Sequence, residues 1–302
     1  MYQVPSQRGR LCVVTGANSG TGLEVTRRLA AAGAEVIMAV RNQEKGDAAR
    51  HDLLAQLPDA RLEVRILDVA DLSSVAHFSE SLTREGRALN VLINNAGVMV
   101  PPTRFETVDG FELQMGTNFL GAFALTLRLL PLMLTADDPR VSTMSSFAAS
   151  FGRIHFDDLE WTHHYRALSA YAQSKLADLL FALRLAEIAR EREWPLTSNA
   201  AHPGYTRTNL MTAGASLGRN TTRRAWVNRA ARFVSQGVAQ GAEPMLYAAT
   251  SPDALNGLYY GPSRVIMGPT TIASPPRTAR DRDVAERLFS LAEELTGVSL
   301  PD

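Results

Sequence analysis

The stretch "RLCVVTGANSGTG" (residues 10–22) begins as an apolar, β-branched run and ends in Gly16, Gly20 and Gly22. The run predicts a buried strand, and the amphipathic pattern over 20–32 predicts the helix that follows it. Glycines at this spacing let the backbone turn tightly and bring N–H groups against a pyrophosphate at the positive end of a helix. The stretch therefore favours a dinucleotide-binding turn over a glycine-rich turn without a ligand.

The same alternation of apolar runs and amphipathic stretches continues along the chain. The further runs are 34–40, 62–69, 89–97, 140–146 and 196–204, and the stretches between them are 42–57, 71–85, 109–135 and 170–192. Strands that are apolar on both faces indicate a parallel sheet covered by helices on both sides, and right-handed crossovers make it doubly wound. We expect an α/β fold, a single doubly wound parallel-sheet Rossmann domain over 1–302. Its dinucleotide-binding half would span about 8–145 and its catalytic and substrate-loop half about 146–302.

Composition narrows the class of protein. The chain has 302 residues, 45% of them hydrophobic, and its 31 Lys and Arg balance 31 Asp and Glu, which argues against nucleic acid as a partner. The single cysteine, Cys12, has no partner for a disulfide and the first residues show no signal peptide, so we expect a cytoplasmic protein. The apolar segment 120–136 contains Arg128 and Pro131. We interpret it as a helix buried against the sheet and expect no transmembrane segment.

The end of the second predicted strand carries Arg41, where a sequence that prefers NAD usually has Asp or Glu. No carboxylate there would repel a 2′-phosphate, and a guanidinium could bind one. Such a charge-assisted bond contributes about 1.5–3 kcal/mol, roughly ten- to a hundredfold in affinity. The sequence therefore favours NADP(H), with NAD(H) as the second candidate. The alternative is that Arg41 only precedes the helix over 42–57 and faces solvent.

The stretch "SAYAQSKLADLLF" (169–181) places Lys175 one helical turn after Tyr171, on the same helix face. A free tyrosine titrates near pH 10, and a cation within about 4–6 Å favours its phenolate form. Taken alone, the pair is as typical of a helix surface as of an acid–base site. The remaining motifs decide between the two.

The glycine spacing, "NNAG" (94–97) and the Tyr171/Lys175 pair together resemble the short-chain dehydrogenase/reductases over about residues 10–265. The segments "DLSSV" and "AHPGYTRTNL" and the long gap between Ser146 and Tyr171 are similar to the retinol-dehydrogenase-like branch. The resemblance implies an NAD(P)-dependent oxidoreductase that interconverts a ketone or aldehyde and an alcohol. It leaves open a nucleotide-binding sensor without turnover, or an epimerase or double-bond reductase on the same scaffold.

The resemblance also implies a role for each member of the catalytic set. Tyr171 would donate a proton to the carbonyl, and Lys175 would make that phenol more acidic and bind the nicotinamide ribose. Ser146 would hold the carbonyl oxygen, and Asn118 would support a water chain to the lysine. The spacing of the motif favours Ser146 over the neighbouring Ser145 as the catalytic serine.

The cofactor contacts implied by the resemblance run along the whole nucleotide. They are Gly16, Asn18, Ser19, Gly20, Thr21, Gly22, Arg41, Asp68, Val69, Asn94, Ala96, Gly97, Tyr171, Lys175, Pro203, Gly204, Thr206 and Thr208. Thr21 stands where relatives usually carry Ile or Leu. Because backbone N–H groups bind the phosphates, we expect this difference to have little effect on cofactor binding. The adjacent His163 and His164 do not converge as ligands would, so no metal site is expected.

Two segments, 147–168 and 209–240, are expected to roof the substrate pocket. An apolar face on a helix over 223–234 would suit a lipophilic carbonyl compound, or would pack on the protein's own core. The expected partner is this small-molecule substrate. Family members commonly pair through their helices, so a homo-oligomer is compatible with the resemblance.

Overall fold

Eight strands form one sheet in the order β3-β2-β1-β4-β5-β6-β7-β8. This computed structural model describes residues 1–204 and 237–301. The strands are β1 (Leu11–Thr15), β2 (Glu35–Val40), β3 (Arg61–Ile66), β4 (Val91–Asn94), β5 (Arg140–Met144), β6 (Thr197–Ala201), β7 (Tyr259–Pro262) and β8 (Thr270–Ile272). Strands β1 to β7 pair in parallel, and β8 pairs antiparallel with β7. The order turns back at β1 and β4, which makes the sheet doubly wound.

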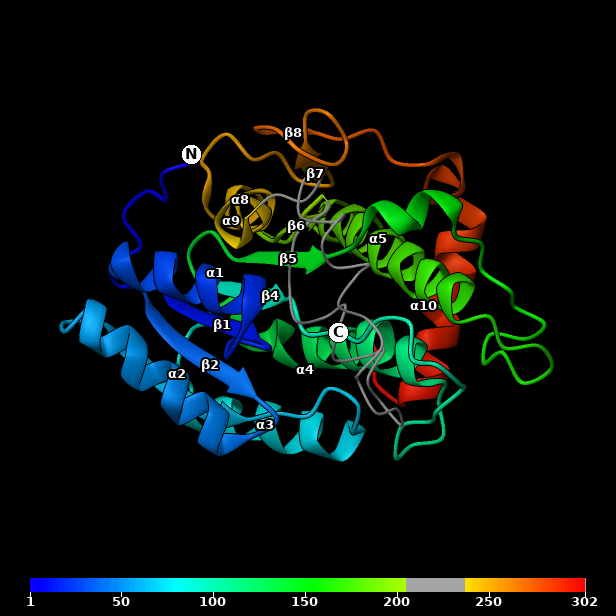
Figure 1. Cartoon of the computed structure of the whole chain (residues 1–302), viewed down its shortest axis with the longest axis horizontal. Coiled ribbons are helices and arrows are strands. Elements are labelled where there is room, and N and C mark those ends of the chain that lie inside the picture. The colour runs from blue at the N-terminus through cyan, green and yellow to red at the C-terminus, as the bar shows by residue number, and fades with distance from the viewer. Residues whose placement is uncertain (205–236, 302) are drawn as a thin grey trace, which may run out of the picture.

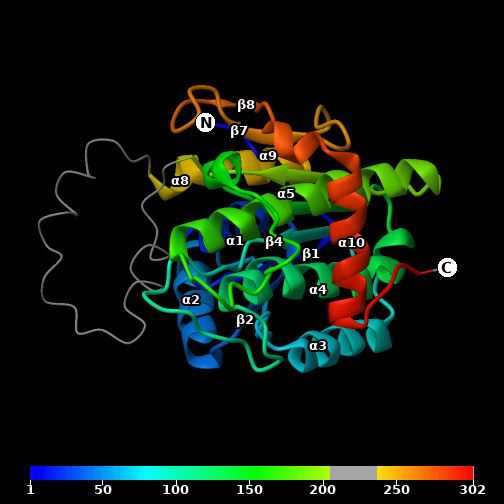
Figure 2. The same cartoon turned by 90° about the vertical axis from the view of Figure 1, so that its right-hand side faces the viewer.

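Helices cover both faces of the sheet (Figure 1). One face carries α1 (Gly20–Ala31), α2 (Gln43–Gln56), α8 (Val238–Gly241) and α9 (Glu243–Thr250). The other carries α3 (Leu72–Glu85), the π-helical η1 (Met115–Leu120), α4 (Gly121–Leu134), α5 (Ala167–Glu191) and α10 (Arg282–Thr296). The described residues also include the short 3₁₀ helices η2 (Phe147–Phe151) and η4 (Arg277–Arg280). Figure 2 shows α10 lying across α4 and α5.

Alternation of side chains along the buried strands gives each face its own core. On β1, Val13 packs into the cluster beneath α3, α4 and α5, whereas its neighbour Val14 packs into the cluster beneath α1 and α9. Both residues are fully buried. This explains why the strands read as continuous apolar runs and confirms the predicted doubly wound α/β fold.

The predicted sheet lacked the two strands at one edge. Strand β7 is the four-residue "YYGP", and β8 is the partly exposed "TTI", which closes the edge in the antiparallel direction. Both are too short for a periodic pattern, and Gly and Pro are residues that disfavour a strand prediction. The boundaries of the helices were easier to predict from the sequence than these strands, as α3 shows. Asp71 caps α3 by accepting from the N–H groups of Ser73 and Ser74, and Gly86 ends it at φ 65°.

The long apolar helix over Met115–Leu134 is the one helix, among the described residues, whose length and composition would allow it to cross a membrane. Its most apolar window is 83% buried inside the structure, between the sheet and its neighbouring helices. It therefore packs as a core helix, as the interpretation of 120–136 expected.

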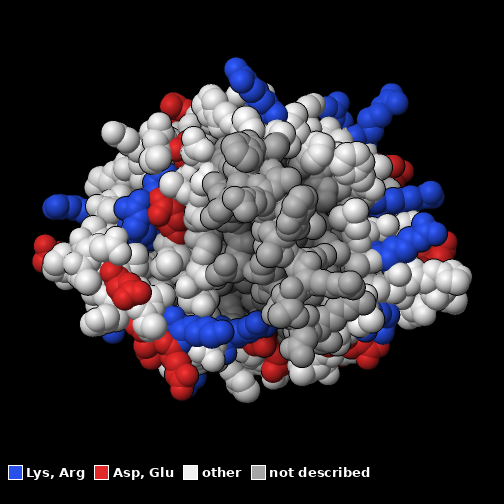
Figure 3. Space-filling view, in the orientation of Figure 1, with Lys and Arg blue, Asp and Glu red and all other residues white. Residues whose placement is uncertain are grey.

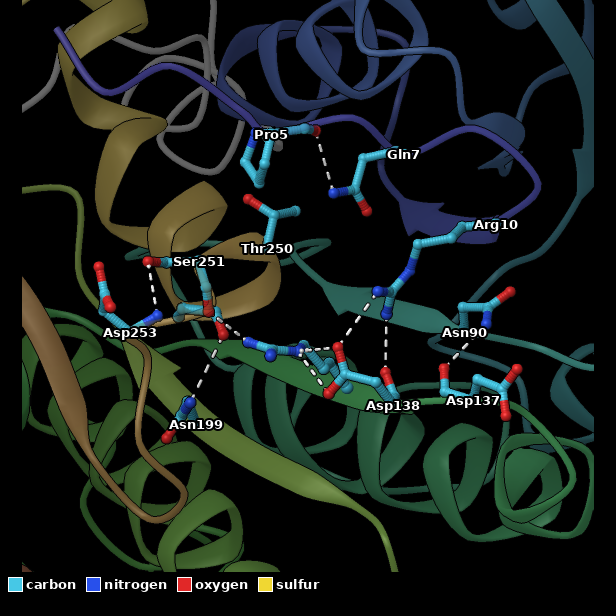
Figure 4. A network of polar contacts seen from close by, with 12 residues as sticks. Pro5, Gln7, Arg10, Asn90, Asp137, Asp138, Asn199, Thr250, Ser251 and Asp253 are labelled. Carbon is cyan, nitrogen blue, oxygen red and sulfur yellow. Dashed lines mark hydrogen bonds and ion pairs between the residues drawn. The ribbon is translucent and has the colours of Figure 1, made fainter.

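A polar network fixes the amino-terminal ends of the strands (Figure 4). Asp138 accepts hydrogen bonds from Arg10 at 3.2 Å and from the nearly buried Arg140 at 2.9 Å. Arg140 also donates to the Ser251 carbonyl oxygen at 2.7 Å, which joins β5 to the end of α9. A cavity of about 380 Å³ lies beside this network, lined by Arg10, Glu35 and Arg87 among others. It lies at the end of the sheet opposite to the one where doubly wound folds bind ligands.

Charged side chains of both signs alternate around the rim of the molecule in the view of Figure 3. On this face the described residues form no extended patch of a single sign.

Gly121 sets the distance between α4 and the loop after β3, because a Cβ there would lie 1.9 Å from the Val69 carbonyl oxygen. We expect Gly121→Ala to lower the free energy of unfolding by at least about 2 kcal/mol, measured by urea denaturation. Gly237→Ala is the matched control, since no described residue lies within 4 Å of a Cβ at that position and its φ is −66°. Equal effects of the two substitutions would show that α4 has room to shift.

Candidate active site

The glycine-rich turn after β1 leaves an open helix end. Gly16 and Gly20 adopt positive φ values of 65° and 56°, and a Cβ on Gly22 would lie 2.4 Å from the Gly16 carbonyl oxygen. Ser19 precedes α1 without capping it through its side chain, and the first turn carries no acidic residue. The first N–H groups of α1 are therefore available for an anion, and the turn fits a pyrophosphate. Asn18 lies half-buried in the same turn.

Side chains from two segments fasten this turn to the end of β4. The Thr15 hydroxyl accepts hydrogen bonds from the N–H groups of Asn95 and Ala96, both at 2.9 Å. Asn95 donates its amide to the Thr15 carbonyl oxygen at 2.9 Å and accepts from the Thr21 hydroxyl at 2.8 Å. Thr21 thus uses its hydroxyl to hold the turn, which a relative with Ile or Leu could not do. Thr15 and Asn95 were not predicted as site residues from the sequence, although "NNAG" was the available signal.

The predicted adenine-side residues follow β2 and β3, whose carboxyl ends share one edge of the sheet. Arg41 follows β2, is exposed, and pairs with no carboxylate among the described residues. Asp68 follows β3 and accepts a hydrogen bond from the Ala70 N–H at 2.9 Å, and Val69 is buried beside it. A guanidinium without a carboxylate partner at the carboxyl end of β2 could bind a 2′-phosphate.

Asn94 is oriented differently from its neighbours. Its side-chain amide donates to the hydroxyls of Thr126 at 2.8 Å and Thr143 at 3.4 Å, so the side chain lies in the core between α4 and β5. A cofactor contact from Asn94 stays a prediction and would involve its backbone.

The predicted nicotinamide-side residues follow β6. His202 comes directly after β6 and is followed by Pro203 and Gly204, and the Gly204 N–H donates to Nδ1 of His202 at 3.4 Å. Thr206, Thr208 and the helix expected over 223–234 lie outside the described residues.

Helix α5 carries the tyrosine and lysine on one face, both nearly buried. The two polar residues between them position other segments. Gln173 donates to the Leu159 carbonyl oxygen at 2.9 Å and so holds the preceding loop against the helix. Ser174 accepts from the amide of Asn118 at 2.9 Å. The Tyr171 hydroxyl itself has no hydrogen-bond partner among the described residues, which leaves it available to a substrate.

Asn118 lies in the π-helical segment η1 and joins three elements. Its side chain accepts from the Val98 N–H at 2.7 Å and donates to the Val98 carbonyl oxygen at 3.0 Å, which fixes the loop after β4. A Cβ on Gly97 would lie 2.9 Å from Asn118 Oδ1 and 3.7 Å from Lys175 Nζ. These three residues therefore converge, and the glycine is required for their close approach.

The two serines after β5 have different roles. Ser145 is buried and donates to the Lys175 carbonyl oxygen at 2.7 Å, so it fixes α5 on the sheet. Ser146 is half-buried and its hydroxyl accepts from the Ala148 N–H at 3.2 Å. Its carbonyl oxygen accepts from the buried Tyr259 hydroxyl at 3.1 Å. Ser146 thus presents the accessible hydroxyl, and Tyr259 on β7 holds its backbone.

The lysine ammonium is bound by two buried acceptors. Lys175 Nζ donates to the Met144 carbonyl oxygen at 2.9 Å and to Asp178 Oδ2 at 2.8 Å. Burial raises the pKa of Asp178 to about 7, against the lowering by the Lys175 ammonium. Asp178 was not predicted from the sequence, although its position three residues after Lys175 was the available signal.

His202 and Tyr259 lie behind the site, with ring centroids 5.0 Å apart. Burial lowers the pKa of His202 to about 4 and raises the pKa of Tyr259 above its usual value. The neutral histidine accepts from the Gly204 N–H and supports the turn after β6.

Comparison with known sequences gives a consistent set of relatives. The profile of the family described as short chain dehydrogenase matches residues 10–216. Polyprenol dehydrogenase of Mus musculus is 37% identical over 305 residues, covering 97% of this chain and 86% of the relative. Retinol dehydrogenase 12 of Homo sapiens is 35% identical over 292 residues, covering 96% and 87%.

Solved structures show the same fold. An uncharacterized protein of Mycobacterium paratuberculosis superposes with a TM-score of 0.82 at 40% identity, covering 99% of this chain and 97% of that one. A structure described as an NAD(P)-dependent gluconate 5-dehydrogenase of Beutenbergia cavernae, with NADP bound at low occupancy, has a TM-score of 0.64 at 25% identity and covers 85% and 96%.

The depressed pKa of His202 makes stability depend on pH. The unfolded chain takes up a proton below about pH 6.5 while the folded protein does not until about pH 4, so the free energy of unfolding falls over that range. From pH 7 to pH 4.5, wild type should lose about 2–3 kcal/mol more than His202→Gln. Urea denaturation at both pH values measures this, and equal losses in the two proteins would contradict it.

Proposed function

The chain belongs to the short chain dehydrogenase family, and we propose that it is an NADP(H)-preferring oxidoreductase that interconverts a lipophilic ketone or aldehyde and an alcohol by hydride transfer. The observation that carries this proposal is the close approach of Asn118 and Lys175 at Gly97, with Tyr171 on the same face of α5 as the lysine. Ser146 follows β5, and the last carbonyl oxygen of that strand accepts a hydrogen bond from the Lys175 ammonium. A protein that only sensed nucleotide would have no use for all four side chains.

The preference for NADP(H) rests on Arg41. Its exposed guanidinium at the end of β2 has no carboxylate partner among the described residues and can bind a 2′-phosphate. The bound NADP in the 25%-identical Beutenbergia cavernae structure supports the same choice.

The nicotinamide, when bound, would supply or accept the hydride. This chain's own residues then handle the oxygen and the proton. The Ser146 hydroxyl, half-buried at the end of β5, would bind the carbonyl oxygen. The Tyr171 hydroxyl would deliver the proton during reduction and remove it during oxidation. Lys175, held at its fixed site, would stabilise the phenolate through its positive charge.

Exposed apolar side chains near these residues support a lipophilic substrate. Phe147 follows Ser146 directly, and Phe151 lies at the end of the same short helix η2. The two side chains are 38% and 75% exposed and pack edge to face with centroids 5.3 Å apart. Leu168, three residues before Tyr171, is 66% exposed. Relatives named for polyprenol and retinol point to the same class of alcohol. The proposed location is the cytoplasm, supported by the free thiol of the buried Cys12.

Removal of one hydroxyl tests the role of Tyr171. We expect Tyr171→Phe to lower kcat at least about a hundredfold, since general acid–base catalysis contributes about 10²–10⁴, while NADPH affinity stays unchanged. Steady-state kinetics and nicotinamide fluorescence measure the two quantities. Tyr247→Phe on α9, whose ring packs on Tyr2 and Tyr260, is the matched control. Turnover retained in Tyr171→Phe would remove this phenol from the mechanism.

Reversal of one charge tests the cofactor preference. Arg41→Asp should favour NADH over NADPH in kcat/KM, because it removes a bond worth about ten- to a hundredfold and adds repulsion of the 2′-phosphate. Arg61→Asp is the control, since Arg61 is also exposed but lies at the beginning of β3, at the other end of the sheet. A preference that did not change in Arg41→Asp would show that the 2′-phosphate is bound elsewhere.

A further inference from the structure

Three polar residues follow one another along a single face of α5. Spacings of four and three residues place Tyr171, Lys175 and Asp178 on that face, with Asp178 the farthest along the helix. Asp178 is 1% exposed and its Oδ2 accepts from Lys175 Nζ at 2.8 Å. Along α5, Lys175 therefore lies between Tyr171 and Asp178.

The helix itself has no need of a carboxylate at this position. The neighbouring Ala177, Leu179 and Leu180 pack in the apolar core, and Oδ1 of Asp178 has no hydrogen-bond partner among the described residues. A buried carboxylate with one unsatisfied oxygen costs free energy, and an apolar residue of similar volume would often be as stable or more so. The hydrogen bond from Lys175 therefore explains why an aspartate stands at this position.

Two acceptors fix the ammonium at the carboxyl end of β5. The Met144 carbonyl oxygen and Asp178 Oδ2 each take one N–H, and an ammonium has three. Gly97 lies beside this site, where a Cβ would be 3.7 Å from Nζ. The lysine is thereby held in one place, with one donor left for a ligand.

We propose that Asp178 is a positioning residue that holds the Lys175 ammonium in place and offsets part of its positive charge at the Tyr171 phenol. This inference rests on the proposed function of the tyrosine. Among the described residues, Lys175 is the charged group that interacts with Asp178, and Tyr171 lies on the same helix face. Tyr259 on β7 interacts electrostatically with Tyr171, and the ring of His202 lies tilted against the ring of Tyr259.

The sign of the effect follows from the charges. An ionised Asp178 makes the lysine–aspartate pair nearly neutral as a whole, so the phenolate gains less from Lys175 than it would from a lone cation. Replacement of the carboxylate by an amide keeps an oxygen for Nζ but removes the negative charge. The phenol should then ionise at lower pH.

The test is a titration of Tyr171 in the protein without nucleotide. Tyrosine labelled with carbon-13 at Cζ gives seven signals, and Tyr171→Phe assigns the one of interest. Asp178→Asn should lower the midpoint of that signal by about one pH unit. The limb of the kcat pH profile that reports the phenol should move the same way. Asp52→Asn, an exposed aspartate on α2, is the control and should change neither.

A carboxylate with only a structural role would lower stability and leave both midpoints where they are, and that result would overturn the inference. Asp178→Leu provides a second uncharged variant of similar volume and should give the same shift. Loss of folded protein in both variants would make the carboxylate a structural requirement and also overturn the inference. Absence of turnover in the wild type would instead refute the proposed function, because the titration needs neither nucleotide nor substrate.

Discussion

A buried lysine ammonium must be paired, and in this protein the pairing of Lys175 organises the candidate site. Its partners are the last carbonyl of β5 and a carboxylate on its own helix, so the sheet and α5 are locked together at this point. Ser145 adds a second bond between the same two elements. The positions of Tyr171 on the helix and of Ser146 after the strand follow from this attachment. Because the buried Lys175 ammonium must be paired, its hydrogen bonds determine how Tyr171 and Ser146 lie relative to each other.

The features that could be predicted from the sequence are those that depend on the spacing of residues close together in the chain. Six of the seven parallel strands, the turn through Gly16, Gly20 and Gly22, and the Tyr171/Lys175 pair depend on periodicity or on residues within one turn. The clamp between Thr15 and Asn95 and the bond from Tyr259 to Ser146 could not be predicted this way, because they join segments that are distant in sequence. They depend on the order of the strands in the sheet, which local sequence patterns do not determine.

The two ends of the sheet differ in what their polar groups do. At the amino-terminal ends, Arg10 and Arg140 both form ion pairs with Asp138. At the carboxyl ends, Arg41, the first turn of α1 and the Tyr171 hydroxyl lack partners among the described residues. Donors that lack partners at the carboxyl ends of the strands are consistent with a ligand site at that end of a doubly wound sheet.

The central claim, that this site binds NADP(H) and reduces a carbonyl, is tested most directly by titration of the purified protein with NADPH and with NADH. Nicotinamide fluorescence follows binding, and a series of lipophilic ketones and aldehydes is then added to the same sample. The account predicts tighter binding of NADPH than of NADH, and oxidation of bound NADPH by at least one of these compounds. Failure of both nucleotides to bind would contradict it.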